Sequence, residues 1–225
     1  AMPIATQEMT AVAVLMGMPS HPISPRVARM GMTVGIMLSS PRRTDQSRAV
    51  MMNDMSTSAS ARLWICPGDT QPDQDDAIVV RLDPGLAFGT GTHPTTRLCL
   101  EWLDAQDNAG TTMLDYGCGS GVLAVAALKL GAESAVAMDI DPQAVTATMR
   151  NAERNRVAGR LQALGSDEEL NGRFDTVVAN ILAGPLVELV DSITSRLSKG
   201  GKLALSGVLS GQVLDIMHAY KPLIR

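Results

Sequence analysis

A glycine-rich loop at residues 115–121, with the sequence DYGCGSG, restricts the possible folds of this chain more than any other segment. It follows a β-prone segment that ends at Leu114 and precedes an apolar run from Val122 to Leu130. This order predicts a strand, a tight turn and a helix. Glycine adopts positive φ readily and lets a ligand approach the backbone closely. Because the turn would also present the unpaired N–H groups of a helix N-terminus, we expect it to bind a nucleotide.

The spacing of the loop glycines indicates which nucleotide is excluded. A dinucleotide-binding turn has the pattern G-x-G-x-x-G, with the pyrophosphate at the helix N-terminus. Here the third glycine comes one residue early, as Gly117, Gly119 and Gly121, and Val122 occupies the position of the last glycine. The pattern therefore argues against NAD.

Two acidic residues extend this interpretation. The segment 135–139 reads as a second strand and ends in Asp139, about 20 residues after the loop, where a carboxylate can accept hydrogen bonds from both ribose hydroxyls. Asp115, at the end of the first strand, would repel a pyrophosphate but suits a cationic ligand such as S-adenosylmethionine. The alternative is that the glycines only form a turn and that the acids are helix caps.

The rest of the chain predicts alternating strands and helices. This alternation indicates an α/β fold with a doubly wound, mostly parallel sheet, whose ligands bind at the carboxyl ends of the strands. Gly117, Asp139 and Asn180 all fall at that edge. The predicted strands are 61–67, 78–82, 111–114, 135–139, 161–164, 174–180 and 201–206, and the predicted helices are 94–103, 122–130, 142–156, 185–197 and 211–219.

Several segments together resemble a known family. DYGCGSG at 115–121, followed by DIDP at 139–142, resembles the class I S-adenosylmethionine-dependent methyltransferases. LDPGLAFGTGTHPTT at 82–96, NAERN at 151–155 and VANILAGPL at 178–186 narrow the resemblance to the PrmA family, which methylates amines of large-subunit ribosomal protein eleven. The resemblance runs from about residue 62 to about residue 220.

The resemblance implies a Rossmann-like methyltransferase sheet with S-adenosyl-L-methionine as cofactor. It also implies that the loop before Thr96 lies over the cofactor, that Thr96 and Asn180 contact it, and that Ser166 lies at the adenine. Such sheets normally end with two further strands, which the sequence after 201–206 lacks. The expected cofactor-binding residues are Thr96, Asp115, Gly117, Gly119, Gly121, Asp139, Ser166 and Asn180.

The acceptor site is expected at Asn180, Ile181 and Leu182. Methyl transfer to an amine requires a neutral amine, so a site with few charges is favoured. The Asn180 amide oxygen can orient an amine N–H while the two apolar residues wall the site. The segment lacks the double proline and aromatic residue of enzymes that methylate nucleobases, so a lysine side chain or an N-terminal amine is the expected acceptor. His93 is open to a structural or a general-base role.

Composition narrows the partners and the compartment. The net charge of −4 argues against direct nucleic-acid binding and suits a basic ribosomal protein. The three cysteines, Cys66, Cys99 and Cys118, are too few and too scattered for a disulfide framework or a metal site, which indicates a reducing, cytoplasmic compartment. No apolar run reaches the length of a membrane span. The oligomeric state is left open.

The chain divides at about residue 60. Residues 1–60 are atypical, rich in Met and Ser, with weak strand potential at 11–15 and 32–38, and we expect them to be poorly ordered or a remnant. Residues 61–225 form the expected methyltransferase domain. An acid-poor N-terminus could instead be an organellar transit sequence.

Three functions follow from these observations. The first is a protein N-methyltransferase that acts on a ribosomal protein. The second is a methyltransferase of the same fold for another protein or a small molecule, since residues 1–60 do not match the substrate-recognition domain of the family. The third is a cofactor-binding remnant without activity.

Overall fold

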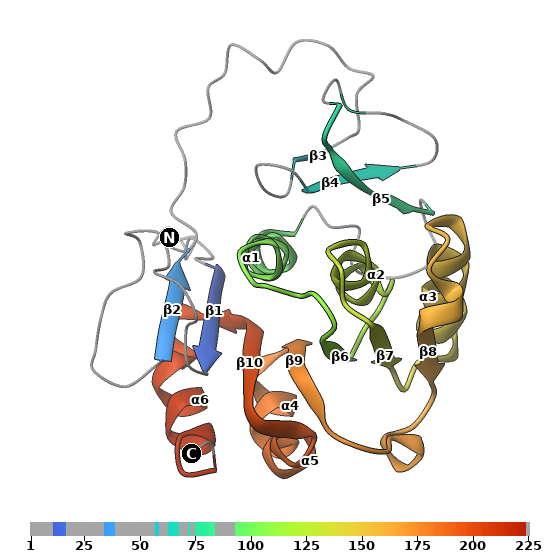
Figure 1. Cartoon of the computed structure of the whole chain (residues 1–225). Coiled ribbons are helices and arrows are strands. Elements are labelled where there is room, and N and C mark those ends of the chain that lie inside the picture. Colours follow the sequence, from blue (N-terminus) through green and yellow to red (C-terminus); the bar gives the residue numbers. More distant parts are fainter. Residues whose placement is uncertain are drawn as a thin grey trace, which may run out of the picture.

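The computed structural model describes residues 11–16, 34–38, 57–58, 63–67, 72, 75–83 and 93–223 of the chain. They form a seven-stranded main sheet, a three-stranded second sheet and two helical layers (Figure 1). The main sheet has the order β2-β1-β10-β9-β6-β7-β8. Its strands are β1 (Ala11–Met16), β2 (Val34–Leu38), β6 (Thr112–Tyr116), β7 (Ser134–Met138), β8 (Leu161–Leu164), β9 (Phe174–Asn180) and β10 (Leu197–Leu209).

The five strands from β10 to β8 are parallel, as the sequence predicts. β6 is the central strand, since it pairs with β7 on one side and with β9 on the other. The chain order therefore reverses at β6. In open parallel sheets the ligand site lies at such a reversal, beyond the carboxyl ends of the strands. The glycine-rich segment begins in the last two residues of β6, Asp115 and Tyr116, and its residues 117–121 form the loop that follows the strand.

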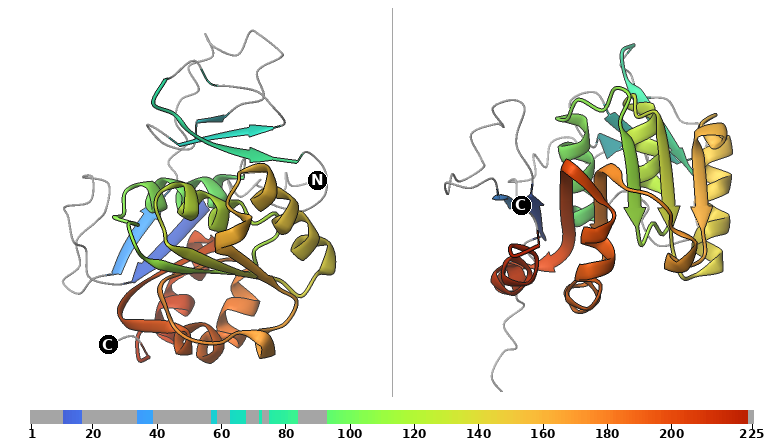
Figure 2. Two further views of the ribbon diagram at one scale, coloured as in Figure 1. Left: turned by 45° about the vertical axis from the view of Figure 1, so that its right-hand side comes forward. Right: turned by 60° about the horizontal axis from the view of Figure 1, so that its bottom comes forward.

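The helices cover both faces of the main sheet (Figures 1 and 2). α1, α2 and α3 lie on one face, and α4, α5 and α6 lie on the other. Each layer follows from chain order. Right-handed crossovers from β6 through β7 to β8 place α2 and α3 on one face, and the crossover from β9 to β10, which runs in the other direction from β6, places α4 and α5 on the opposite face. The helices are α1 (Pro94–Asp104), α2 (Val122–Lys129), α3 (Pro142–Arg154), α4 (Ala183–Glu188), α5 (Val190–Ser195) and α6 (Val213–Tyr220).

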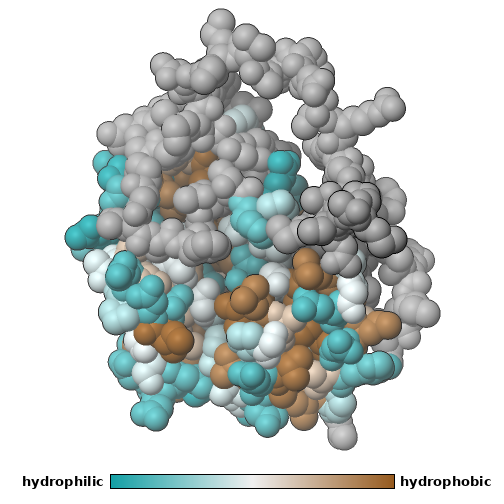
Figure 3. Space-filling model, turned by 180° about the vertical axis from the view of Figure 1, so that it is seen from behind, coloured by the Kyte–Doolittle hydropathy of each residue, from teal (hydrophilic) through white to brown (hydrophobic). Residues whose placement is uncertain are grey.

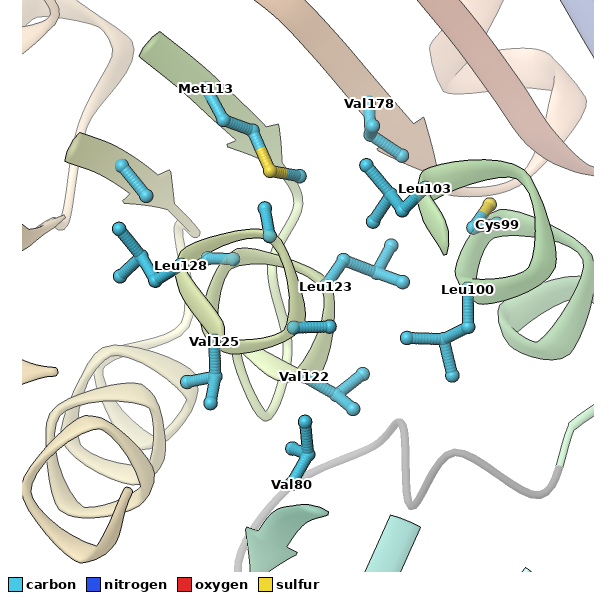
Figure 4. Close-up of a cluster of buried hydrophobic side chains, with 14 of the residues drawn as sticks. Val80, Cys99, Leu100, Leu103, Met113, Val122, Leu123, Val125, Leu128 and Val178 are labelled. Carbon is cyan, nitrogen blue, oxygen red and sulfur yellow. The ribbon is translucent and has the colours of Figure 1, made fainter. Parts of the chain in front are cut away.

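α2 is the most deeply enclosed helix. All of its residues from Val122 to Leu128 are buried. Figure 4 shows the reason: strand side chains such as Met113 face it from one side, and Val80 of the second sheet faces it from the other. A helix that is apolar on all sides is stable only in such an enclosed position.

A second core fills the opposite face of the main sheet. It joins Leu114 and Tyr116 of β6 to Leu186 of α4 and to Ile216 and Tyr220 of α6. The Tyr220 hydroxyl is buried in this core and donates a 2.7 Å hydrogen bond to the carbonyl of Leu186. Successive residues of β6 thus point into different cores, with Asp115 facing the α2 side, where it accepts a hydrogen bond from Ala124.

The second sheet packs outside α2 and α3. It contains β3 (Thr57–Ser58), β4 (Leu63–Pro67) and β5 (Ile78–Leu82). Asn155, the C-cap residue of α3, binds β5 through both its amide groups: Oδ1 accepts from the Arg81 N–H at 2.8 Å, and Nδ2 donates to the Arg81 carbonyl at 2.7 Å. One side chain therefore substitutes for a neighbouring strand at this position.

Three predictions need correction. The sheet does not end after the fifth parallel strand, because β1 pairs antiparallel with β10 and β2 pairs with β1. These strands come from the N-terminal segment, at its two weakly β-prone positions, and cover an edge that would otherwise be unpaired. β10 begins at Leu197, not at 201, since its register shifts between Leu197 and Lys202 and the chain stays in the strand across this irregularity. The helix expected at 185–197 is two helices, α4 and α5, separated at Leu189, where φ is −98° and ψ is 15°.

The surface carries several exposed apolar side chains among polar ones (Figure 3). The described residues include no helix that is long and apolar enough to span a membrane. The exposed large apolar residues are Ile140, Leu182, Val187, Leu209, Leu214 and Leu223.

We expect the substitution Asn155→Ala to lower the free energy of unfolding by about 2–3 kcal/mol, because it leaves the partly buried N–H and C=O of Arg81 without their partner. Urea unfolding measures this change. Asn171→Ala is the matched control, since Asn171 is exposed and its amide bonds only the nearby Glu169 carbonyl, so a change within about 0.5 kcal/mol is expected. Equal losses in the two variants would contradict the role of Asn155.

Candidate active site

The glycine-rich loop connects β6 to α2 at the carboxyl edge of the sheet. Gly117, Gly119 and Gly121 all have positive φ, at 77°, 54° and 72°. The N–H groups of Gly117 and Cys118 both donate to the carbonyl of Met138, at 2.8 and 3.0 Å. The loop is therefore fixed to the end of β7, the strand that leads to Asp139.

At two of these positions neighbouring side chains also leave no room for a Cβ atom. A Cβ atom at Gly117 would collide with the Ile181 side chain, and one at Gly121 would lie 2.7 Å from Oγ1 and Cγ2 of Thr148. Both positions thus need glycine for the backbone angle and for the close approach of a neighbouring segment. The loop is held between the end of β9 on one side and α3 on the other.

Asp139 faces the loop, as the sequence predicts. Its Oδ2 accepts a 2.9 Å hydrogen bond from the Gly119 N–H, and its Oδ1 accepts one from the Asp141 N–H at 3.0 Å. Asp141 in turn caps α3 by accepting from the Gln143 N–H at 2.9 Å, with Pro142 in the first turn. A carboxylate held by two backbone groups has a fixed orientation and still has lone pairs for the hydroxyls of a ligand.

Asp115 is enclosed, with an exposed fraction of 1%. Its Oδ2 accepts from the Ala124 N–H at 3.1 Å, and its Oδ1 is buried with no hydrogen-bond partner. Burial raises the pKa of this carboxyl to about 7; the Ala124 N–H acts in the opposite direction, and the nearby Asp139 adds to the increase. A cation next to Oδ1 would stabilise the charged carboxylate and supply the missing partner.

Asn180 lies at the end of β9, beside the first turn of α1. Its Nδ2 donates to Oγ1 of Thr96 at 3.1 Å, and its Oδ1 is buried without a partner. In the next strand, the Ser206 hydroxyl donates to the Thr95 carbonyl at 3.2 Å. The ends of β9 and β10 thus hold the start of α1, and the Asn180 amide oxygen is left available.

The other expected residues lie along the same edge. Ile181 is half-buried and packs against Gly207, where a Cβ would overlap the Ile181 backbone. Leu182 is 73% exposed, so it walls a site only from the outside. Ser166 follows β8, and its hydroxyl accepts from the Glu168 N–H at 3.1 Å. The register pairs Met138 with Leu164, so Ser166 and Ile140 are equally far beyond the sheet.

Two residues of α3 support the loop and were not predicted as site residues. The Thr148 hydroxyl donates to the Gly119 carbonyl at 3.2 Å, and Asn151 Nδ2 donates to the Ser120 carbonyl at 2.8 Å. Asn151 Oδ1 also accepts from the Asp83 N–H at 2.9 Å. The sequence signal was present: both are polar residues on a helix face that is otherwise lined by Ala144, Ala147 and Ala152.

His93 and Cys118 have structural roles in this geometry. His93 is the N-cap of α1, where Nδ1 accepts from the Thr95 N–H and lies 2.7 Å from the Thr95 hydroxyl. Burial raises the pKa of the Cys118 thiol, which keeps it protonated and unreactive. In the described part of the chain, no group of three or more His, Cys, Asp or Glu side chains could hold a metal ion. Most of the loop expected to cover the cofactor, residues 84–92, lies outside the described residues.

Comparison with known proteins agrees with this arrangement. The family model of the ribosomal protein L11 methyltransferases (PrmA) matches residues 42–224. The chain belongs to the ribosomal protein L11 methyltransferase family. Within this family, the chain is 55% identical over 177 residues to the protein named ribosomal protein L11 methyltransferase in Photobacterium profundum. The aligned region covers 78% of this chain and 60% of that protein. The corresponding protein of Histophilus somni is 54% identical over 178 residues, with 79% of this chain and 60% of that protein covered.

A solved structure of a family member supports the fold. The ribosomal protein L11 methylase of Lactobacillus delbrueckii subsp. bulgaricus has a TM-score of 0.69 and 37% sequence identity to this chain, and the match covers 75% of this chain and 88% of that one. The chain thus spans about 60% of the length of the curated L11 methyltransferases that it matches. The family match includes the glycine-rich loop, Asp139 and Asn180.

We expect Asp115 to make the ligand-free protein less stable as the pH rises from about 4 to about 7. The ordinary pKa of 3.8 applies to the unfolded chain, and burial raises the folded value to about 7. Between these values the folded protein holds a proton that the unfolded chain has released, so a higher pH favours unfolding; above about pH 7 the effect is constant. A folded pKa near 7 corresponds to a loss of at most about 4 kcal/mol.

Urea unfolding of the natural protein and of Asp115→Asn at about pH 4.5 and about pH 7.5 measures this effect. The Asn side chain keeps an acceptor for the Ala124 N–H and does not titrate. The variant should gain stability relative to the natural protein as the pH rises. An identical pH dependence of the two proteins would contradict the raised pKa.

Proposed function

We propose that this chain binds S-adenosyl-L-methionine and transfers its methyl group to amines of ribosomal protein L11. The observation that carries this proposal is that two of the three buried side-chain oxygens without a hydrogen-bond partner in the described residues, Asp115 Oδ1 and Asn180 Oδ1, belong to the adjacent strands β6 and β9 near their carboxyl ends. The first suits a cation and the second suits an N–H donor. The family of the chain supports the same chemistry.

The residues present fit the cofactor. The carboxylate of Asp139 would accept from the ribose hydroxyls, and Asp115 would face the cationic methionine part. Gly117, Gly119 and Gly121 all have positive φ, and a Cβ atom at Gly117 or Gly121 would collide with Ile181 or Thr148, so glycine is what allows the loop to take this shape next to the cofactor. The cofactor supplies an electrophilic methyl group on a sulfonium, so the protein needs neither a covalent nucleophile nor a metal.

The acceptor amine must lose its proton before transfer. A lysine with a pKa of about 10.4 is neutral at pH 7 only at a penalty of about 4–5 kcal/mol, unless the site lowers that pKa. Asn180 Oδ1 provides an acceptor for the amine N–H without a full negative charge. Ile181 and Leu182 add apolar surface on the outer side.

Thr96 holds the Asn180 side chain at the end of β9. Asn180 Nδ2 donates to Thr96 Oγ1 at 3.1 Å, and this orientation leaves the amide oxygen available to the amine. A flipped amide would present an N–H group to the amine and would not orient it. Thr96 therefore has a positioning role, and Asn180 contacts the reacting amine.

The identity of the substrate, ribosomal protein L11, is a separate part of the proposal. L11 methylation is the activity in the names of the relatives, and this chain spans about 60% of their length. The net charge of −4 suits a basic ribosomal protein. A ribosomal substrate also implies a cytoplasmic location.

The cofactor is tested by isothermal titration calorimetry with S-adenosylmethionine. We expect binding to the natural protein and at least about tenfold weaker binding to Asp139→Ala, because the variant loses the acceptor for both the Gly119 N–H and the ribose. Asp175→Ala is the matched control. Asp175 is an exposed carboxylate at the start of β9, at the opposite end of the strand from Asn180, and it accepts hydrogen bonds from the N–H and the hydroxyl of Thr112. No binding to the natural protein would exclude the methyltransferase proposal.

Transfer is tested with methyl-labelled cofactor and purified L11. We expect Asn180→Asp to lower the rate by about 100-fold while cofactor affinity changes by less than about tenfold, since a carboxylate at this position favours the charged ammonium. Gln162→Glu makes the same amide-to-carboxylate change at an exposed site of β8 and should keep the natural rate. Full activity of Asn180→Asp would contradict the role of Asn180, and label on another protein or a small amine would contradict the L11 assignment.

A further inference from the structure

The turn that follows β8 leaves the sheet beside the ribose-binding carboxylate. The Asp139 N–H donates to the Leu164 carbonyl at 3.1 Å, so Gly165 and Ser166 extend beyond the edge next to Asp139. The turn then forms a single 3-10 segment, Asp167–Glu169. Under the proposed function, this turn forms the adenine end of the cofactor site.

The turn has few contacts of its own. Its internal hydrogen bonds run from the Glu168 N–H to the Ser166 hydroxyl and from the Leu170 N–H to the Asp167 carbonyl, both at 3.1 Å, and from the Glu169 N–H to the Ser166 carbonyl at 3.3 Å. Leu170 is its one buried apolar residue, and Glu168 and Glu169 are exposed. A 3-10 segment this short does not fix its own position.

α5 and the residue after it supply the missing contacts. Arg196 donates from Nη1 to the Leu170 carbonyl at 2.7 Å and from Nη2 to the Asp167 carbonyl at 3.4 Å. The same Nη2 lies 3.7 Å from Asp167 Oδ1. The Ser192 hydroxyl donates to Asp167 Oδ2 at 2.7 Å. Side chains of α5 and of the residue after it therefore hold both ends of the turn, at Asp167 and at Leu170.

Tyr116 connects this cluster to the glycine-rich loop. It is 3% exposed and directly precedes Gly117. Burial, followed by the negative charge of Asp167, raises the pKa of the Tyr116 phenol to about 12, so the phenol lies close enough to Asp167 to feel its charge. The cluster thus extends from the adenine end of the edge to the start of the loop.

We infer that Arg196 and Ser192 are positioning residues for the adenine end of the cofactor site. The inference rests on the proposed function, since it assigns a role within that site. Neither residue is at the sheet edge, and both act through Asp167 and Leu170. Removal of either contact frees the turn and lowers the affinity for any ligand that carries adenosine.

A purely structural role would give a different result, and Arg173 provides the comparison. Its Nη1 donates to the Leu197 carbonyl at 3.0 Å, which is the same kind of bond that Arg196 makes. Arg173 precedes β9, and its hydrogen bond joins that strand to the start of β10. The Arg173 side chain donates no hydrogen bond to residues 166–170. Arg173→Lys therefore removes a guanidinium bond but leaves the turn in place.

The test is calorimetric titration of Arg196→Lys, Ser192→Ala and Arg173→Lys with S-adenosylhomocysteine and with adenosine. We expect the dissociation constant to rise by about tenfold for Arg196→Lys and by about threefold for Ser192→Ala, by the same factor for both ligands, and by less than about twofold for Arg173→Lys. Thermal unfolding of the ligand-free proteins establishes whether the two lysine variants lose similar stability.

The outcomes separate the two proposals. If the natural protein binds neither ligand, the proposed function fails and the inference fails with it. If the natural protein binds and Arg196→Lys and Ser192→Ala match Arg173→Lys, only the positioning role is overturned. Ser192→Ala decides the question if Arg196→Lys does not fold, because Ser192 lies on a helix surface and its loss removes only one hydrogen bond from the turn.

Discussion

The hydrogen bond from the Gly119 N–H to Asp139 holds the site together, because it joins the loop after β6 to the end of β7. It requires a carboxylate at the end of one strand and a glycine with positive φ after the neighbouring strand. The Met138 carbonyl, which accepts from Gly117 and Cys118, brings these two groups together. The nucleotide edge is thus fixed by backbone contacts before any ligand binds.

The same edge combines two kinds of polar group. Asp139 is held by protein N–H donors, whereas Asp115 and Asn180 each have a buried oxygen without a partner. Buried polar atoms without partners are destabilising, so they are uncommon outside functional sites. Stability contributed by the two cores therefore offsets the cost of this edge, whose two unpartnered oxygens we propose to face a cation and an amine.

Local sequence patterns predicted most of this arrangement. Strands 161–164 and 174–180 and the Asp141 cap of α3 were found because apolar runs and turn residues determine them within a few positions. Thr148, Asn151 and the Arg196 cluster were not, because their roles depend on contacts between segments 25 or more residues apart. The pairing of β1 with β10 was missed for the same reason: strand potential does not specify a partner.

Nuclear magnetic resonance of the protein with 15N-labelled glycine, titrated with S-adenosylhomocysteine, shows whether the glycine-rich loop contacts the ligand. We expect the Gly117 and Gly119 amide signals to shift on binding, and the signal of Gly172, which precedes β9 at the opposite end of the sheet, to stay unchanged. Binding that leaves the loop glycines unchanged, or no binding at all, would contradict the role proposed for the loop.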